Sequence, residues 1–276
     1  MKIGTHGGGF KRYPLEKVFE IASRTGFDGV EVVAERPHFY PEDVDAAAID
    51  NLFKLREKYN IEVPVYCLNV LDSQYLIPGR NPAQILETRD FVKKALHIAS
   101  DAEIPMLLLN CGHAGYGTNR RENQKLIKKE LLYMLDEADK VGVDVIIEPI
   151  SIYESNTYYL LDDIVELLED LNHPRAVTML DTATPFCHWE PYADYFEKMG
   201  DKLRYVHFVD ADGVSEAHLR LGTGKLPLVE VLRIFKRFNY DGWCTIEILS
   251  GYKRDAEMYA GHDLKVMKAL LKEAGY

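Results

Sequence analysis

The sequence predicts an α/β protein, a (β/α)8 barrel of the TIM type, with residues 1–276 forming a single domain. Strand-like and helix-like segments alternate from end to end, eight of each, and no low-complexity or Pro/Ser-rich stretch divides them. Repeated strand–helix units favour parallel strands with right-handed crossovers, and eight such units close into a barrel of about this length. A doubly wound open sheet is the alternative, but no G-x-G-x-x-G motif follows the first strand-like segment.

The predicted strands are short runs rich in Val, Ile, Leu and Thr, with turn signals at their ends. Nearly unbroken apolar runs of this kind are typical of parallel strands covered on both faces. In chain order, the predicted strands span 2–6, 29–34, 63–69, 105–110, 143–148, 176–181, 203–210 and 243–248.

One predicted helix follows each strand, and the first begins at Pro14, a residue suited to a first helical turn. A long loop is predicted between the seventh strand and its helix. In chain order, the predicted helices span 14–25, 44–59, 82–101, 120–140, 161–170, 191–199, 227–238 and 255–274.

Composition and charge exclude several classes of protein. A formal net charge of −11 argues against nucleic acid as a partner, because neutralising phosphates requires a basic surface. No apolar run approaches the roughly 20 residues needed to span a bilayer, and the first residues lack the apolar core of a signal peptide. We therefore expect a cytoplasmic protein with no membrane partner. The four cysteines show no C-x-x-C spacing, so we expect reduced thiols rather than disulfides or a zinc site.

Four acidic or imidazole side chains stand at or near the ends of late strands: Glu148, Asp181, His207 and Glu247. Burying an unpaired charge costs several kcal/mol, roughly, so such residues need a partner or a metal. The carboxyl ends of barrel strands converge on one mouth, where these four would meet. Each one alone could equally be a polar residue that faces solvent or caps a helix. Together they favour a divalent-metal site and a small-molecule enzyme.

Longer motifs resemble those of the xylose isomerase-like barrels, which include ketose 3-epimerases, hydroxypyruvate isomerases, inosose dehydratases and endonuclease IV. Within that family the chain is most similar to the fructoselysine 3-epimerases. The segments that carry the resemblance are GVEVVAERPH (29–38), NCGHAGY (110–116), EPISIYESN (148–156), GDKLRYVHFVDADG (200–213) and EAHLRLGTGKLPL (216–228).

The resemblance implies that Glu148, Asp181, His207 and Glu247 bind one divalent metal ion. Mn²⁺ or Co²⁺ is expected, with Mg²⁺, Fe²⁺, Ni²⁺ or Zn²⁺ as alternatives, because mixed carboxylate and imidazole ligands do not select one metal. It also makes Glu148 and Glu247 the catalytic pair. One would remove the C3 proton of a ketose, or of a ketose conjugate such as fructoselysine, and the other would return a proton to the opposite face of a metal-stabilised enediolate.

Substrate-binding roles also follow from the resemblance. Glu154 in YESN, His113 in NCGHAGY and His218 are implied to contact the sugar. Glu216 and His218 resemble the D-x-H element that precedes a G-x-G loop in this family. The segment after Asp181 lacks the histidine that tagatose-type epimerases carry there, which weakens a simple tagatose or psicose assignment.

Further residues are expected at the barrel mouth. Arg36 and His38, in the RPH that follows the second strand, are implied to contact the substrate tail. Asp210 and Asp212 either orient His207, since ligating imidazoles usually donate their second N–H, or cap the DADG turn. The N-terminal half should line the mouth with His6, Glu31, Tyr66 and Asn69.

The sequence therefore predicts an isomerase with a small-molecule sugar substrate, and a homo-oligomer, either a dimer or a tetramer. Four alternatives share the fold: a sugar dehydratase, a hydroxypyruvate-type isomerase, an endonuclease IV-like phosphodiesterase and a sugar-binding barrel without catalytic activity. The phosphodiesterase would need three zinc ions and a basic surface, which the negative charge opposes.

Overall fold

The strands of the computed structural model coincide with the predicted apolar runs. The structure describes residues 1–68, 70, 74–215, 217–247 and 252–276. Predicted mouth residue Asn69 and Glu216 of the D-x-H-like element lie outside these residues. The strands are β1 Lys2–His6, β2 Gly29–Val33, β3 Val65–Cys67, β4 Met106–Asn110, β5 Asp144–Glu148, β6 Ala176–Asp181, β7 Leu203–Phe208 and β8 Trp243–Ile246.

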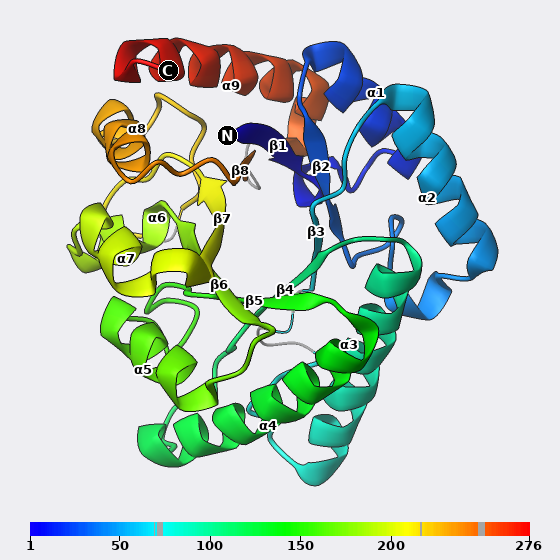
Figure 1. Ribbon diagram of the computed structural model, residues 1–276, viewed down its shortest axis with the longest axis vertical. Coiled ribbons are helices and arrows are strands. Elements are labelled where there is room, and N and C mark those ends of the chain that lie inside the picture. Colours follow the sequence, from blue (N-terminus) through cyan, green and yellow to red (C-terminus); the bar gives the residue numbers. More distant parts are fainter. Residues whose placement is uncertain (69, 71–73, 216, 248–251) are drawn as a thin grey trace.

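All eight strands are parallel and form one closed barrel in chain order. Strand β1 pairs with both β2 and β8, which closes the sheet. The helices form an outer ring that follows the order of the chain (Figure 1). The predicted (β/α)8 fold class is confirmed, and the carboxyl ends of all eight strands lie at one mouth.

The helices of the outer ring also follow the prediction closely. One helix, α6, was not predicted: it has six residues and contains Pro185, too short a stretch to show helical periodicity. The helices are α1 Leu15–Thr25, α2 Ala46–Tyr59, α3 Pro82–Asp101, α4 Arg120–Val141, α5 Leu161–Leu171, α6 Ala183–His188, α7 Tyr192–Met199, α8 Leu228–Arg237 and α9 Tyr252–Ala274.

Side chains cap the N-termini of three of the long helices. Asp45, Asn81 and Asn119 accept hydrogen bonds from the backbone N–H of the residue three positions on, at 2.9, 3.0 and 3.2 Å. Each bond satisfies an amide that has no partner within its helix. At the opposite ends of α1 and α4, Gly26 and Gly142 adopt left-handed φ angles of 96° and 75°, which glycine tolerates without strain.

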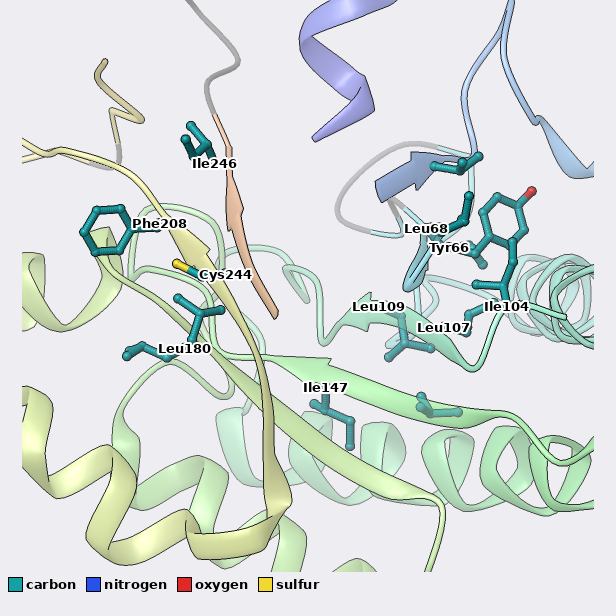
Figure 2. Packing of buried hydrophobic residues seen from close by; sticks show 14 of the residues in the cluster. Tyr66, Leu68, Ile104, Leu107, Leu109, Ile147, Leu180, Phe208, Cys244 and Ile246 are labelled. Carbon is teal, nitrogen blue, oxygen red and sulfur yellow. The ribbon is translucent and has the colours of Figure 1, made fainter. Parts of the chain in front are cut away.

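Side chains along each strand alternate between the outside and the inside of the barrel. On β5, Val145 and Ile147 pack outward in the layer between strands and helices, whereas Ile146 belongs to a separate cluster inside the barrel. Figure 2 shows part of the outer layer, with Leu109, Ile147 and Leu180 on neighbouring strands. The same alternation turns the side chain of residue 148 inward, at the end of β5.

Mainly apolar residues fill the barrel interior on the N-terminal side of the mouth. On each strand they lie two or four positions before the residue that faces the mouth. The interior cluster contains Val65, Met106, Leu108, Ile146, Val177, Met179 and Tyr205. This plug leaves the inward positions at the strand ends as the place where a polar site can form.

The alternation also shows that one sequence prediction is wrong. Tyr66 was expected to line the mouth, but it is fully buried in the outer layer, and its hydroxyl donates a hydrogen bond to the Phe39 carbonyl. Its neighbours on β3, Val65 and Cys67, take the inward positions. A single residue of register therefore decides which side chain of VYC reaches the mouth.

Candidate active site at the barrel mouth

The four predicted ligands converge at the mouth. Glu148, Asp181 and His207 lie on β5, β6 and β7, and Glu247 directly follows β8. Asp181 and His207 are register partners on adjacent strands. One ligand atom from each of the four residues lies within 4.8 Å of the others, and all four residues are buried.

His207 lies at the centre of this group. Its Nδ1 atom is 3.1 Å from Glu148 Oε1 and 3.0 Å from Glu247 Oε2. On the other side of the ring, Nε2 is 2.9 Å from Glu31 Oε2. The imidazole therefore lies between carboxylates on both sides.

The donor set suits a divalent cation. Three carboxylates and one imidazole offer the oxygen and nitrogen ligands that Mn²⁺, Co²⁺ and similar ions accept. Glu247 Oε2 is buried and lies 3.0 Å from His207 Nδ1 and 3.4 Å from His218 Nδ1, but it accepts no well-aligned hydrogen bond from either, so its position suits a bound cation. Asp181 uses Oδ1 to accept a 2.6 Å hydrogen bond from the Ala183 amide, which fixes the carboxylate. These residues fit one metal ion, and their role as ligands stays a prediction.

Burial and charge separate the pKa values of the two glutamates. Burial raises the pKa of Glu148 to about 7, although the hydrogen bond and charge of His207 oppose this shift. Burial would also raise the pKa of Glu247, but the charges of His207, His218 and His6 outweigh it, so this pKa is lowered. Without a metal, Glu148 binds a proton far more readily than Glu247 does.

The imidazoles respond in the opposite sense. Burial favours neutral His207, but the negative charges of Glu247 and Glu31 outweigh burial, so the pKa of His207 lies well above its usual value. For His218 the charges of Asp181 and Glu247 likewise overcome burial and raise the pKa to about 10. In the metal-free site His207 therefore holds a proton that a bound metal ion would have to displace.

A cavity of about 290 Å³ opens above these groups, near the lower end of the range for small-molecule pockets. Three of the four predicted ligands line it, together with Glu154, His218 and His6. Among the described residues of its lining, Lys11 is the only lysine or arginine, and its ammonium group lies 3.1 Å from Glu35 Oε2.

His218, a predicted substrate contact, lies beside two of the predicted ligands. Its Nε2 atom is 3.2 Å from Asp181 Oδ2, and its Nδ1 atom is 3.4 Å from Glu247 Oε2. The loop that carries His218 joins β7 to α8. His218 therefore reaches the site from a segment without regular secondary structure, and the conformation of that loop decides its position.

Asp210 holds this loop in place. Its carboxylate accepts hydrogen bonds from the amides of Ala211, Gly222, Gly224 and Leu226, at 2.8 to 3.0 Å. Asp212 accepts from the amides of Val214 and Ser215, both at 2.8 Å. Of the two roles considered for these aspartates, the structure supports fastening of turns, and the carboxylate that contacts His207 Nε2 is Glu31 instead.

Glu154 and His113 occupy neighbouring loops. Glu154 lines the cavity, whereas the described lining does not include His113, whose Nδ1 accepts a 2.9 Å hydrogen bond from the Gly115 amide. Asn156, the last residue of YESN, ties the two loops together. Its Oδ1 accepts from the Ala114 amide at 3.0 Å, and its Nδ2 donates to the Gly115 carbonyl at 2.9 Å.

Arg36 and His38 make contacts away from the cavity. The Arg36 guanidinium binds both carboxylate oxygens of Asp43 and lies over the ring of Tyr40. His38 Nε2 lies 2.9 Å from the Tyr13 carbonyl oxygen. Neither residue is among the described residues that line the cavity. Their contact with a substrate tail stays a prediction.

Two inward residues of the N-terminal half matter more than their sequence signal suggested. His6 and Glu31 were expected only to line the mouth, and they are register partners on β1 and β2. His6 Nε2 lies 3.6 Å from both Glu31 Oε1 and Glu247 Oε1. Glu31 stands in the middle of an apolar strand, GVEVV, and this buried acid was the one sequence signal of its role.

A closed parallel barrel with buried carboxylates and imidazoles at its mouth defines the class of protein: an α/β barrel with a candidate metal centre. Residues 19–270 match the family model described as xylose isomerase-like TIM barrel. The chain belongs to this family.

Several relatives of the chain are epimerases. The chain is 33% identical over 273 residues to fructoselysine 3-epimerase of Escherichia coli O157:H7, covering 99% of each chain. It is 24% identical to L-ribulose 3-epimerase of Methylomonas sp. strain DH-1, over 85% of this chain and 78% of that protein. A crystal structure of D-psicose 3-epimerase in the presence of D-fructose superposes with a TM-score of 0.82 at 16% identity, over 100% of both chains. These relatives confirm the predicted enzyme class, an isomerase of the ketose 3-epimerase type.

Proposed function

We propose that this protein is a divalent-metal-dependent ketose 3-epimerase, in which Glu148 and Glu247 are the acid/base pair. The observation that carries the proposal is the convergence of two glutamates, one aspartate and one histidine on a single point of the mouth. The full-length similarity to an epimerase supports the same reaction.

The residues that would hold the metal are Glu148, Asp181, His207 and Glu247. When bound, a divalent cation would supply Lewis-acid stabilisation of the negative charge that develops on substrate oxygens. This Lewis-acid stabilisation is needed because a C–H bond beside a carbonyl is a very weak acid. Mn²⁺ and Co²⁺ are the proposed ions.

The two glutamates would divide the proton transfers. Glu247, whose pKa is lowered, would take the C3 proton as a carboxylate, and the electrons of the C3–H bond would pass through C2 to the carbonyl oxygen. Glu148 would return a proton to C3 from the opposite face. In the reverse direction the roles exchange. Two bases at the carboxyl ends of non-adjacent strands, β5 and β8, are consistent with inversion at a single carbon.

We propose a small-molecule sugar substrate, either a free ketose or a ketose conjugate such as fructoselysine. The conjugate is supported by the fructoselysine 3-epimerase relative. Glu154 and His218, both of which line the cavity, are proposed substrate contacts, and His113 is proposed as a further one. Assembly as a dimer or tetramer and a cytoplasmic location stay predictions from the sequence.

The test is proton NMR of ketoses and fructosamines in D₂O with the Mn²⁺-loaded enzyme. We expect deuterium to enter at C3 and the 3-epimer to appear. Each of Glu148→Gln and Glu247→Gln should abolish epimerisation, because inversion at C3 needs a proton carrier on each face, whereas the carboxylate that remains can still exchange the C3 proton of one epimer. Epimerisation that survives either substitution would refute the two-base assignment.

The same experiment separates the alternative reactions. A dehydratase would lose water and give an ultraviolet-absorbing enone, and a hydroxypyruvate-type isomerase would move hydrogen between C1 and C2. Deuterium confined to C3, without an enone product, excludes both.

A further inference from the structure

Glu31 lies deep in the barrel beside the candidate site, but the proposed reaction gives it no role. Its side chain is fully buried on β2 and faces the interior. The basic side chains nearest to it are the imidazoles of His207 and His6. Burying a carboxylate is unfavourable unless its contacts compensate, so the bonds that Glu31 makes indicate its role.

Glu31 determines which nitrogen of His207 can bind a metal. Glu31 Oε2 lies 2.9 Å from His207 Nε2, and a carboxylate at this distance accepts the proton on that nitrogen. Without a metal, Nδ1 also faces carboxylates, Glu247 and Glu148 at 3.0 to 3.1 Å, and can donate a proton to them. A cation bound between these groups would displace the Nδ1 proton, while Glu31 keeps the proton on Nε2, so the lone pair would be on Nδ1. The tautomer imposed by Glu31 is the one that the proposed metal site needs.

Two hydroxyls hold Glu31 in this position. Tyr205 donates its hydroxyl proton to Glu31 Oε2 at 2.7 Å. Because that proton is used, Thr245 is the donor in the 2.5 Å contact between Thr245 Oγ1 and the Tyr205 hydroxyl. Glu31, Tyr205 and Thr245 come from β2, β7 and β8, and all three are fully buried.

The same reasoning argues against a second metal site beside Glu31. His6, Glu31 and Cys67 also bring ligand atoms within 4.8 Å of one another. However, the Gly8 amide donates a 3.1 Å hydrogen bond to His6 Nδ1, so the proton of neutral His6 is on Nε2. The nitrogen that faces Glu31 Oε1 is therefore a donor and offers no lone pair.

We propose that Glu31 is a positioning residue that fixes the tautomer and orientation of His207 and thereby strengthens metal binding. This inference rests on the proposed metal site and adds Glu31, supported by Tyr205, as the group behind its histidine ligand. Carboxylates that accept the second N–H of a ligating histidine typically change metal affinity by about 10- to 100-fold when they are replaced.

The test is Mn²⁺ binding to Glu31→Gln, measured by titration calorimetry and by the electron paramagnetic resonance of free Mn²⁺. Glutamine keeps the size of the side chain but removes the charge, and we expect affinity about 10- to 100-fold weaker. The matched control is Glu130→Gln, because Glu130 is equally buried but pairs with Arg89 on the outside of the barrel. That variant should bind Mn²⁺ as the wild type does.

A spectroscopic measurement separates positioning from general loss of structure. In the Co²⁺-loaded wild type, the Nε2 proton of His207 should give a paramagnetically shifted signal that exchanges slowly with D₂O. Glu31→Gln should shift this signal and speed its exchange, and Glu130→Gln should not. If Glu31→Gln fails to fold, Tyr205→Phe, which removes one bond to Glu31, should show the same changes to a smaller degree.

The possible outcomes are distinct. If the wild type binds Mn²⁺ and Glu31→Gln, or Tyr205→Phe in its place, binds equally tightly with an unchanged His207 signal, the positioning role is refuted while the proposed function stands. If the wild type binds no divalent metal, both fail. Weaker binding confined to the Glu31 and Tyr205 variants supports the inference.

Discussion

Replacing Asp210 by asparagine should destabilise the protein strongly, even though the change removes only a charge. Asp210 is 1% exposed, and its two oxygens accept four backbone N–H bonds from the loop between β7 and α8. Oδ1 bonds the amides of Ala211 and Leu226, and Oδ2 bonds those of Gly222 and Gly224. The amide oxygen of an asparagine can keep one pair of these hydrogen bonds, but its NH₂ group would then face the other two backbone N–H donors.

The magnitude follows from the two bonds that are lost. Hydrogen bonds to a charged group contribute about 1.5–3 kcal/mol each, so losing two costs about 3–6 kcal/mol. This is a large fraction of the total free energy of unfolding of a typical domain, about 5–15 kcal/mol. Because the same loop carries His218 to within 3.2 Å of Asp181, the variant should also lose activity.

Urea unfolding followed by circular dichroism measures this effect. The control is Asp212→Asn, two residues along the chain. Asp212 bonds the amides of Val214 and Ser215 nearer the surface, where water can replace the lost bonds, so its loss should be much smaller. Equal unfolding midpoints for Asp210→Asn and the wild type, or equal losses in the two variants, would refute the reasoning.

Two more predictions concern the same site. Burial raises the pKa of Glu148 to about 7, so metal binding must displace a proton near neutrality, and Mn²⁺ affinity should fall as the pH drops below 7. Calorimetry in buffers of different ionisation enthalpy should detect the released proton, and a pH-independent affinity would contradict this. Gly224→Ala should destabilise the loop as Asp210→Asn does, because its Cβ would lie 2.5 Å from the Ala211 carbonyl oxygen and closer still to Asp210 Oδ1. The control, Gly261→Ala in helix α9, meets nothing within 4 Å and should be neutral or stabilising by up to about 1 kcal/mol; thermal unfolding of both variants decides.

The strands were predictable because their signal is local. Each apolar run that forms a strand carries its own pattern and its own turn signals, so the runs ending at Glu148 and Asp181 could be recognised without knowing their partners. Helix α6 was missed because six residues with an internal proline show no periodicity. Tyr66 was misplaced because both faces of a parallel strand are apolar, and the sequence of β3 does not show which residues point inward.

Convergence of Glu148, Asp181, His207 and Glu247 also followed from the sequence, once the barrel was assumed. Residues at the carboxyl ends of barrel strands must meet, however far apart they are in the chain. The roles of Asp210 and Asp212 could not be chosen in the same way. Both stand close to His207 in sequence, but strand direction carries Asp210 past the mouth and into the loop, where backbone amides surround it.

The sequence by itself determined the alternation of strands and helices, and with it the barrel and the four acidic or imidazole residues at its mouth. Only the tertiary structure decided what lies behind them. Glu31 and His207 are 176 residues apart and on non-adjacent strands, and they meet because their inward side chains lie at matching depth once the barrel closes. Depth across a barrel depends on the stagger of all eight strands together, which no local pattern of residues encodes.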